Sequence, residues 1–549
     1  MLKRLYWTAV IGLGLLACGG AIAAEPLFRV GIVTDTHLNG DRPDPIERLR
    51  RAYRLFRDKQ VALIANCGDF ACKFDPVAYG RYAAIRRETY PDSAAAPKEV
   101  YVWADHDWID YPGAKGTDAW SRGFADVRRL LGIDHDMYAH FALNGFEFLV
   151  FPELADMTRY EREIAAAETR AGVGRPVFVF EHAPAFGTTE AANDWGATNR
   201  LDVLSRHPQV IAVNGHSHGS LRNERNIWQG AFTSVSAGCL AHWMEQLPGV
   251  PGVRMYWSWG CLVMEVHPDR AVFRRYDLQE MEEIGARDPW TVAWPHDPVH
   301  PRYSPASCAE RAAKPFFPPQ ARLVLKPDST QTFDRVEVSF PAAGPGDAVF
   351  CHRLKIERRD ADGRWTPLAS RDLRAEYHLP VRQRKAELKD TLTAAYFEGV
   401  DVCRVSVTPV DFWGNCGQPL ETVWTVPPTR PWKTVWEGVP EGCEKAVRFG
   451  WSGHWKLPDC VAKGVSKGAK LRVTADLALR QSDRRGAIVS LRGLDSGETA
   501  FTVRTPPGES DLRYAGEFAA LGDERQELSV RFGDGGRLVV RRLRLEMRP

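Results

Sequence analysis

The sequence shows almost no imbalance of charge and, after its first 24 residues, no apolar run long enough to cross a membrane. Its 549 residues hold 72 lysines and arginines against 70 aspartates and glutamates, so it lacks the basic excess of proteins that follow nucleic-acid phosphates. Internal repeats and low-complexity tracts are also missing, which excludes solenoids and disordered chains. We therefore expect a globular protein of about two to four domains, with no specific nucleic-acid partner.

The cysteines do not have zinc-finger spacing, so a structural zinc site of that kind is excluded. Ten cysteines remain when Cys18 is set aside, and an even number permits disulfides in an oxidising compartment. The pairs expected from proximity are Cys443 with Cys460, and two of Cys351, Cys403 and Cys416.

Residues 1–24 have the features of a secretory signal peptide. Lys3 and Arg4 precede an apolar stretch and an end rich in small residues. Two processing routes are open: cleavage after Ala23 or Ala24, which we favour, or lipoprotein processing that leaves an acylated Cys18. Either route predicts export to the periplasm or the extracellular space.

Residues 25–287 alternate apolar runs with amphipathic stretches, which predicts a layered α/β domain. The expected strands are 28–34, 61–67, 99–104, 146–151, 177–181, 210–214, 232–237 and 262–266. The expected helices are 46–60, 76–88, 118–131 and 159–171.

Eight prolines between residues 288 and 320 predict a linker, 288–317, without regular structure. Beyond it only strand-like runs separated by turn residues follow, so residues 318–427 and 428–549 are each expected to form an all-β sandwich. The first resembles a fibronectin type III module in its 336–340 and 405–415 segments. The second is similar to jelly rolls only in its architecture.

Five short motifs rich in His and Asp each follow a predicted strand of the α/β region. They are Asp35-Thr36-His37, Gly68-Asp69, Asp105-His106-Asp107, His182 and Gly215-His216-Ser217-His218. Loops beyond the carboxyl ends of strands converge on one crevice in an open α/β sheet, so these residues can share one site. Imidazoles mixed with carboxylates suit one or two divalent ions such as Zn, Mn or Fe.

In this order the motifs resemble those of the calcineurin-like metallophosphoesterase superfamily, whose pattern is D-x-H, G-D, G-N-H-D/E, H and G-H-x-H. The resemblance covers residues 28–280 and implies a four-layer α/β/β/α sandwich that holds two divalent metal ions. The residues implied for the first ion are Asp35, His37, Asp69 and His218. Those implied for the second ion are a bridging Asp69 together with Asp105, His182 and His216.

The resemblance also implies the reaction, which is hydrolysis of a phosphomonoester or phosphodiester. A hydroxide bridging the two ions would attack phosphorus in line. His106 would protonate the leaving oxygen or stabilise charge on the phosphoryl group, and Asp107 would orient His106. The expected substrate is a small molecule or a glycan or lipid phosphate ester outside the cytoplasm. The motifs do not distinguish monoesterases from diesterases.

Asp105 departs from the pattern, because the superfamily has Asn at this position. A carboxylate can bind the same ion through oxygen, but a third carboxylate lowers the positive charge of the site. Two interpretations stay open: a tolerated change of ligand, or altered substrate choice and lost turnover.

The competing function is that of a non-catalytic or weakly active binding protein of the cell envelope. Six tryptophans lie between residues 413 and 455, and exposed aromatic rings can stack on sugars. Such a protein would contact carbohydrate through its β-sandwiches. The same tryptophans could instead fill the sandwich cores and their junction.

Overall fold

The computed structural model describes most of the chain. The described residues are 25–40, 43–113, 115–190, 192, 196–241, 243–245, 254–256, 259–346, 348–439, 444–448, 452–456, 468–480, 487–493, 499–504, 510–519, 526–532 and 535–548. The predicted signal peptide and the Cys443 and Cys460 pair lie outside them. No helix within the described residues is long and apolar enough to cross a membrane.

The first sheet has the strand order β14-β13-β12-β1-β2-β3, and β15 also pairs with β13. Its strands β1, β2 and β3 are parallel, whereas β12 is antiparallel to β1. The bounds are β1 Phe28–Val33, β2 Leu63–Asn66, β3 Lys98–Tyr101, β12 Gly260–Val266, β13 Arg270–Asp277, β14 Glu282–Ile284 and β15 Trp290–Ala293.

The second sheet has the order β4-β5-β6-β7-β9-β8. Four strands are parallel: β5, β6, β7 and β9. The edge strands β4 and β8 are antiparallel to their neighbours. The bounds are β4 Ala139–Leu143, β5 Phe146–Val150, β6 Val177–Phe180, β7 Val210–Asn214, β8 Ile227–Gln229 and β9 Thr233–Ser236.

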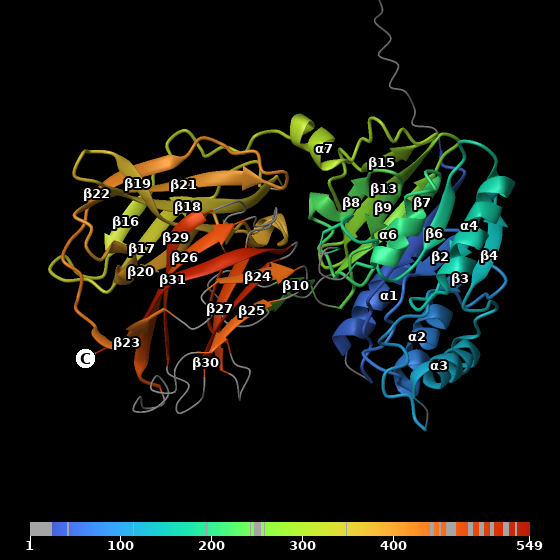
Figure 1. Ribbon diagram of the computed structural model, residues 1–549. Coiled ribbons are helices and arrows are strands. Elements are labelled where there is room, and N and C mark those ends of the chain that lie inside the picture. Colours follow the sequence, from blue (N-terminus) through green and yellow to red (C-terminus); the bar gives the residue numbers. More distant parts are fainter. Residues whose placement is uncertain are drawn as a thin grey trace, which may run out of the picture.

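The two sheets pack face to face and carry helices on their outer faces (Figure 1). Phe28 of the first sheet lies edge-on to Phe146 and Phe148 of the second, with ring centroids 5.8 and 6.1 Å apart. The outer helices are α1 (Pro43–Asp58), α2 (Pro76–Thr89) and α3 (Gly116–Leu131) on the first sheet, and α4 (Met157–Ala171) and α6 (Thr198–Leu204) on the second. The sequence predicted this α/β layering, and the structure confirms it.

The proline-rich segment is not the unstructured linker that its composition predicts. Strand β15 pairs with β13, and its Trp290 is 1% exposed in the core between the sheets. Helix α7 (Pro305–Arg311) follows, with a proline in its first turn. Prolines just outside a strand or in a helix's first turn need no backbone N–H, so they interrupt neither element.

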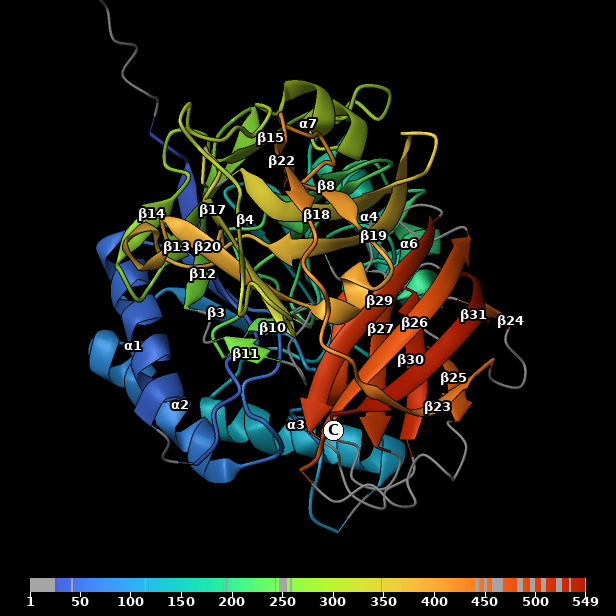
Figure 2. The same ribbon diagram turned by 90° about the vertical axis from the view of Figure 1, so that its left-hand side faces the viewer.

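The next region consists of two facing antiparallel sheets, as the all-β prediction requires (Figure 2). One contains β16 (Val324–Pro327), β17 (Arg335–Pro341) and β20 (Glu387–Thr393). The other contains β18 (Val349–Arg359), β19 (Trp365–Arg374), β21 (Val402–Asp411) and β22 (Leu420–Thr425), with the short helices η2 (Val381–Gln383) and η3 (Ala394–Phe397) between strands. The fibronectin type III assignment stays a prediction.

The C-terminal region is also all-β and pairs two antiparallel sheets. The first holds β23 (Lys433–Gly438), β24 (Glu444–Arg448), β26 (Lys470–Arg480), β29 (Ser510–Ala519) and β31 (Gly535–Met547). The second holds β25 (Ser452–Lys456), β27 (Ala487–Gly493), β28 (Thr499–Arg504) and β30 (Gln526–Phe532). The buried guanidinium of Arg472 pairs with Glu546 of the same sheet and Glu398 of the preceding region, which ties the two regions together.

The disulfide expected between two of Cys351, Cys403 and Cys416 does not form. All three cysteines are free thiols. For Cys351 and Cys416 the strand register explains why. Val410 lies between them, opposite Cys351 on one side and opposite Cys416 on the other. Two strand spacings put those Cα atoms about 9.5 Å apart, beyond the reach of a disulfide.

Candidate metal centre

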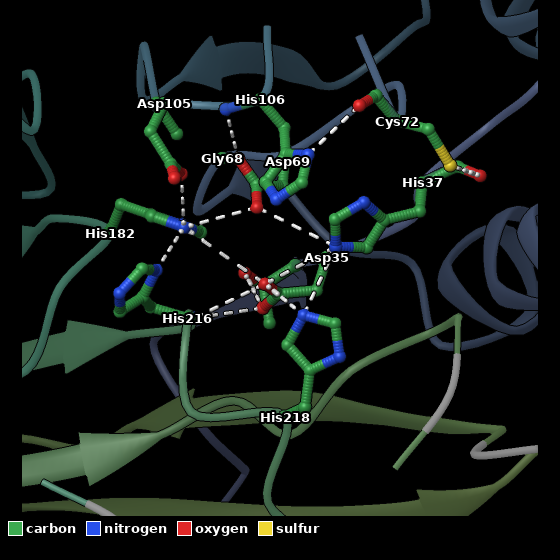
Figure 3. A network of polar contacts seen from close by, with 12 residues as sticks. Asp35, His37, Gly68, Asp69, Cys72, Asp105, His106, His182, His216 and His218 are labelled. Carbon is green, nitrogen blue, oxygen red and sulfur yellow. Dashed lines mark hydrogen bonds and ion pairs between the residues drawn. The ribbon is translucent and has the colours of Figure 1, made fainter. Parts of the chain in front are cut away.

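The five His and Asp motifs meet at one edge of the two facing sheets (Figure 3). Each follows the carboxyl end of a parallel strand: β1, β2 and β3 in the first sheet and β6 and β7 in the second. Two groups of side chains result, each with ligand atoms within 4.8 Å of one another. They are Asp35, His37, Asp69 and His218, and Asp105, His182 and His216.

Left-handed backbone turns aim these side chains inward. The φ angles are 49° for Asp35, 56° for Asp69 and 48° for His218, a region that non-glycine residues rarely occupy outside functional sites. At Gly68, φ is 102° and an added Cβ would lie 2.6 Å from the His182 ring. The loops therefore accept local strain that the strand ends hold in place.

The first group is closely packed. The Nε2 atoms of His37 and His218 are 3.0 Å apart, and the His218 Nε2 lies 3.1 Å from Asp35 Oδ1. Asp69 Oδ2 lies 3.5 Å from the His37 Nε2. Ligands about 2.0–2.2 Å from a shared ion stand about 3.0–3.5 Å apart, so these spacings fit one divalent ion.

Asp69 joins the first group to the second. The same Oδ2 atom that faces His37 lies 3.3 Å from His182 Nε2. That nitrogen is also 3.1 Å from His216 Nδ1 and 3.7 Å from Asp105 Oδ1. One carboxylate oxygen thus stands between two sets of imidazoles, which is the arrangement of a carboxylate that bridges two ions.

Burial and charge explain the electrostatics of the cluster. Burial would raise the pKa of Asp35, but His218 and two further imidazoles hold that pKa well below its usual range. In return Asp35 raises the pKa of His218 well above its ordinary value, against the effect of burial. Burial and the neighbouring His182 lower the pKa of His216 to about 4. Buried carboxylates and imidazoles in this mixture are the donor set of Zn, Mn or Fe.

Backbone carbonyls orient two of the imidazoles. His182 Nδ1 lies 2.8 Å from the carbonyl oxygen of Cys67, and His106 Nδ1 lies 2.8 Å from that of Cys72. Because a carbonyl only accepts, both rings carry the proton on Nδ1 and present Nε2 to the site. His106 also groups with Asp69 and Asp105 as a set that could hold an ion.

Asp107 does not orient the His106 ring, which is the role that the resemblance implies for it. Its carboxylate is fully buried and accepts hydrogen bonds from the backbone N–H groups of Asp69, Phe70, Ala71 and Ala104. The His106 ring is oriented by the Cys72 carbonyl instead. Asp107 therefore fixes the loop after β2 against the loop after β3, and it acts on the site through the backbone.

Glu153 is a site neighbour that the motifs do not reveal. Burial raises the pKa of its carboxyl to about 7, and the nearby Asp105 and Asp69 add to this against the effect of His182. One carboxyl oxygen is buried and has no hydrogen-bond partner among the residues that the structure describes. The sequence signal that could have found it is its position three residues after β5, equivalent to that of the motif residues after the other strands.

Comparison with known proteins gives only distant resemblances. No protein-family model matches the chain, and no curated protein matches it significantly. A dimetal phosphatase from Danio rerio is 13% identical, with a TM-score of 0.33, over 49% of this chain and 99% of that one. The GAP50 anchor of the Plasmodium inner membrane complex is 12% identical, with a TM-score of 0.34, over 49% and 89%.

A carbohydrate-binding module from Cellvibrio mixtus lichenase 5A, solved with cellotriose, also matches a part of this chain. It is 10% identical, with a TM-score of 0.13, over 21% of this chain and 91% of that one. No functional conclusion follows from similarities this low.

Proposed function

We propose that the protein is a metal-dependent phosphoric ester hydrolase with two divalent ions. The observation that carries the proposal is Asp69 Oδ2, which lies 3.5 Å from the His37 nitrogen of one group and 3.3 Å from the His182 nitrogen of the other. A bridging carboxylate between two imidazole-rich groups suits paired Mn, Zn or Fe ions. Such ions supply Lewis-acid charge to an anionic phosphate ester and activate water for attack on phosphorus.

The chain's own residues account for positioning and for proton transfer. His182 and the first group hold Asp69 from both sides, so its carboxylate needs no rearrangement as charge develops. His106 keeps its Nδ1–H on the Cys72 carbonyl, so in its imidazolium form, which carries a second proton on Nε2, it would give that Nε2 proton to the leaving oxygen. Asp107 holds the two loops that carry Asp69 and His106.

The open side of the centre is where the substrate is expected to bind. The Asp105 side chain is 39% exposed, whereas those of Asp35 and His182 are fully buried. We extend the proposal to monoesters or diesters of small molecules, glycans or lipids outside the cytoplasm, with the β-sandwiches contacting carbohydrate or the cell envelope. The composition of residues 1–24 supports the export part of this proposal.

The test is hydrolysis of aryl phosphate mono- and diesters after chelation and refilling with Mn²⁺ or Zn²⁺. Asp69→Ala and His182→Ala should each lose at least about a hundredfold in kcat, since even outer-shell partners of metal ligands contribute 10–100-fold. The matched controls are Asp110→Ala and His300→Ala, whose side chains are 63% and 82% exposed.

Metal-dependent turnover that survives in both controls and fails in both site variants would support the proposal. Full turnover in the Asp69→Ala protein would contradict it. Two bound ions without turnover on any ester would favour the binding-protein function.

A further inference from the structure

A cavity lies between the metal-binding region and the first β-sandwich. Its volume is about 400 Å³, within the roughly 300–1,000 Å³ of small-molecule sites. Arg48 of α1 and Trp259 line one side, and Leu379, Pro380 and Gln383 line the other. The salt bridge between Arg382 and Glu280, with N and O 2.7 Å apart, holds the two regions together nearby.

The lining carries no net charge. Within the lining, Arg222 is paired with Asp277 at an N···O distance of 3.0 Å, and it also binds Glu282, which does not line the cavity, at 2.7 Å. Arg48 and Asp44 contribute one charge of each sign. Burial, together with nearby arginines, lowers the pKa of His378 to about 3, so this ring is neutral. A neutral lining does not favour a phosphate or another anion.

The lining combines one indole ring with several polar groups. The guanidinium carbons of Arg48 and Arg51 lie 5.6 and 5.0 Å from the centroid of the Trp259 ring. Gln279 and Gln383 are exposed at the rim, and the described part of the chain gives their amide groups no hydrogen-bond partner. Amides both donate and accept, as hydroxyl groups do.

The cavity is a separate site from the metal centre. Ser220 and Leu221 line it, and they follow the metal-centre residue His218 after one glycine. Ala241 links the two places through its backbone, since it donates to the carbonyl of Asp35 and accepts from Arg48. The Asp35 and His218 side chains point toward one another within the metal centre (Figure 3).

We propose that this cavity is a binding site for a neutral sugar ring. The C–H face of a pyranose would lie on Trp259, a contact that aromatic rings favour. Its hydroxyl groups, which both donate and accept, would pair with Gln279, Gln383 and the Asp44 carboxylate. Because η2 supplies Gln383 and the metal-binding region supplies Trp259, a bound sugar contacts both regions at once. The proposal does not depend on the phosphoesterase function.

The test is binding of glucose, galactose, mannose and xylose to the full chain, by saturation-transfer NMR and then calorimetry. At least one sugar should bind in the millimolar range, equally well with and without metal. Trp259→Ala and Gln383→Ala should each weaken binding by about tenfold or more. Gln383 is exposed, so its variant should fold even if Trp259→Ala does not.

Gln331→Ala is the matched control, because Gln331 is also exposed and lies outside the cavity. Adenosine serves as a competing ring-shaped probe. The proposal is overturned if none of the four sugars binds, if only adenosine binds, or if binding survives in both cavity variants, which would place the sugar on another surface. Because binding is measured without metal, failure of the phosphoesterase proposal would leave this result unaffected.

Discussion

The two halves of the metal centre differ in their exposure. In the half formed by Asp35, His37, Asp69 and His218, no side chain is more than 5% exposed. In the other half Asp105 is 39% exposed, His216 is half-buried and only His182 is fully buried. Both halves use the same residue types and share Asp69, so the difference lies in access to solvent.

This difference indicates a division of labour. Buried charges persist only when they are paired or coordinate an ion, and in the closed half Asp35 is surrounded by imidazoles that stabilise its charge. That half is therefore prepared for a tightly held ion. The open half is exposed to solvent through Asp105, so we expect its ion to exchange more readily and to meet the substrate.

The largest effect should come from removing one ligand from each half. His218→Ala should abolish tight metal binding and activity, whereas His216→Ala should keep one ion and lose activity only. A ligand at a thousandfold excess over its Kd stabilises a protein by about 4 kcal/mol, so Mn²⁺ should raise the Tm of the His216→Ala protein but not that of the His218→Ala protein.

Metal content by mass spectrometry after gel filtration would check the same comparison. One retained ion in the His216→Ala protein and none in the His218→Ala protein is the expected result. Equal loss of ions from the two variants would show that the halves do not differ in affinity.

A smaller effect should separate Asp107 from His106. Asp107→Ala leaves four buried backbone N–H groups without an acceptor, and unsatisfied buried groups cost about 1–3 kcal/mol each. We expect the free energy of unfolding to fall by at least about 3 kcal/mol. His106→Ala should change stability by less than about 1 kcal/mol and should lower kcat instead.

Urea unfolding and steady-state kinetics on both variants would measure this. If His106→Ala proved the more destabilising change, His106 would be structural and the proton-transfer role would fail. Rescue of its kcat with esters of better leaving groups, which need no proton, is the readout that a structural role would not give.

The sequence predicts which side chains form the metal centre better than it predicts the residues that hold them in place. The motifs at the ends of strands indicate which side chains meet, because parallel strands bring their carboxyl ends to one edge. The sequence does not reveal that Asp107 holds backbone N–H groups, since an Asp beside a His reads as its hydrogen-bond partner. Nor does it reveal Glu153, which stands alone after a strand without a second polar residue.

The wrong predictions about the fold have a similar cause. The number of prolines between residues 288 and 320 predicts an unstructured linker, but their positions at the ends of β15 and α7 decide the outcome. The cysteines of the first β-sandwich are close in sequence, yet strand pairing places Val410 between Cys351 and Cys416. In both cases long-range pairing overrides a local pattern.

The smallest effect should come from Asp105→Asn, which introduces in the open half the residue of the pattern that the motifs resemble. Burial would raise the pKa of Asp105, but His182 and two other imidazoles lower it, so a negative charge stands where the substrate phosphate is expected. Asn keeps an oxygen ligand and removes that charge. We expect kcat to be unchanged or up to about tenfold higher, which corresponds to about 1.4 kcal/mol of transition-state stabilisation.

The Asp105→Asn measurement requires saturating metal, because a neutral ligand binds the ion more weakly and would otherwise mask the gain. Asp110→Asn is its control, since it makes the same change on a 63% exposed side chain. A tenfold or greater fall in kcat for Asp105→Asn alone would show that the carboxylate is needed. The open half would then be specialised by its charge as well as by its exposure, and the tolerated-ligand interpretation would be wrong.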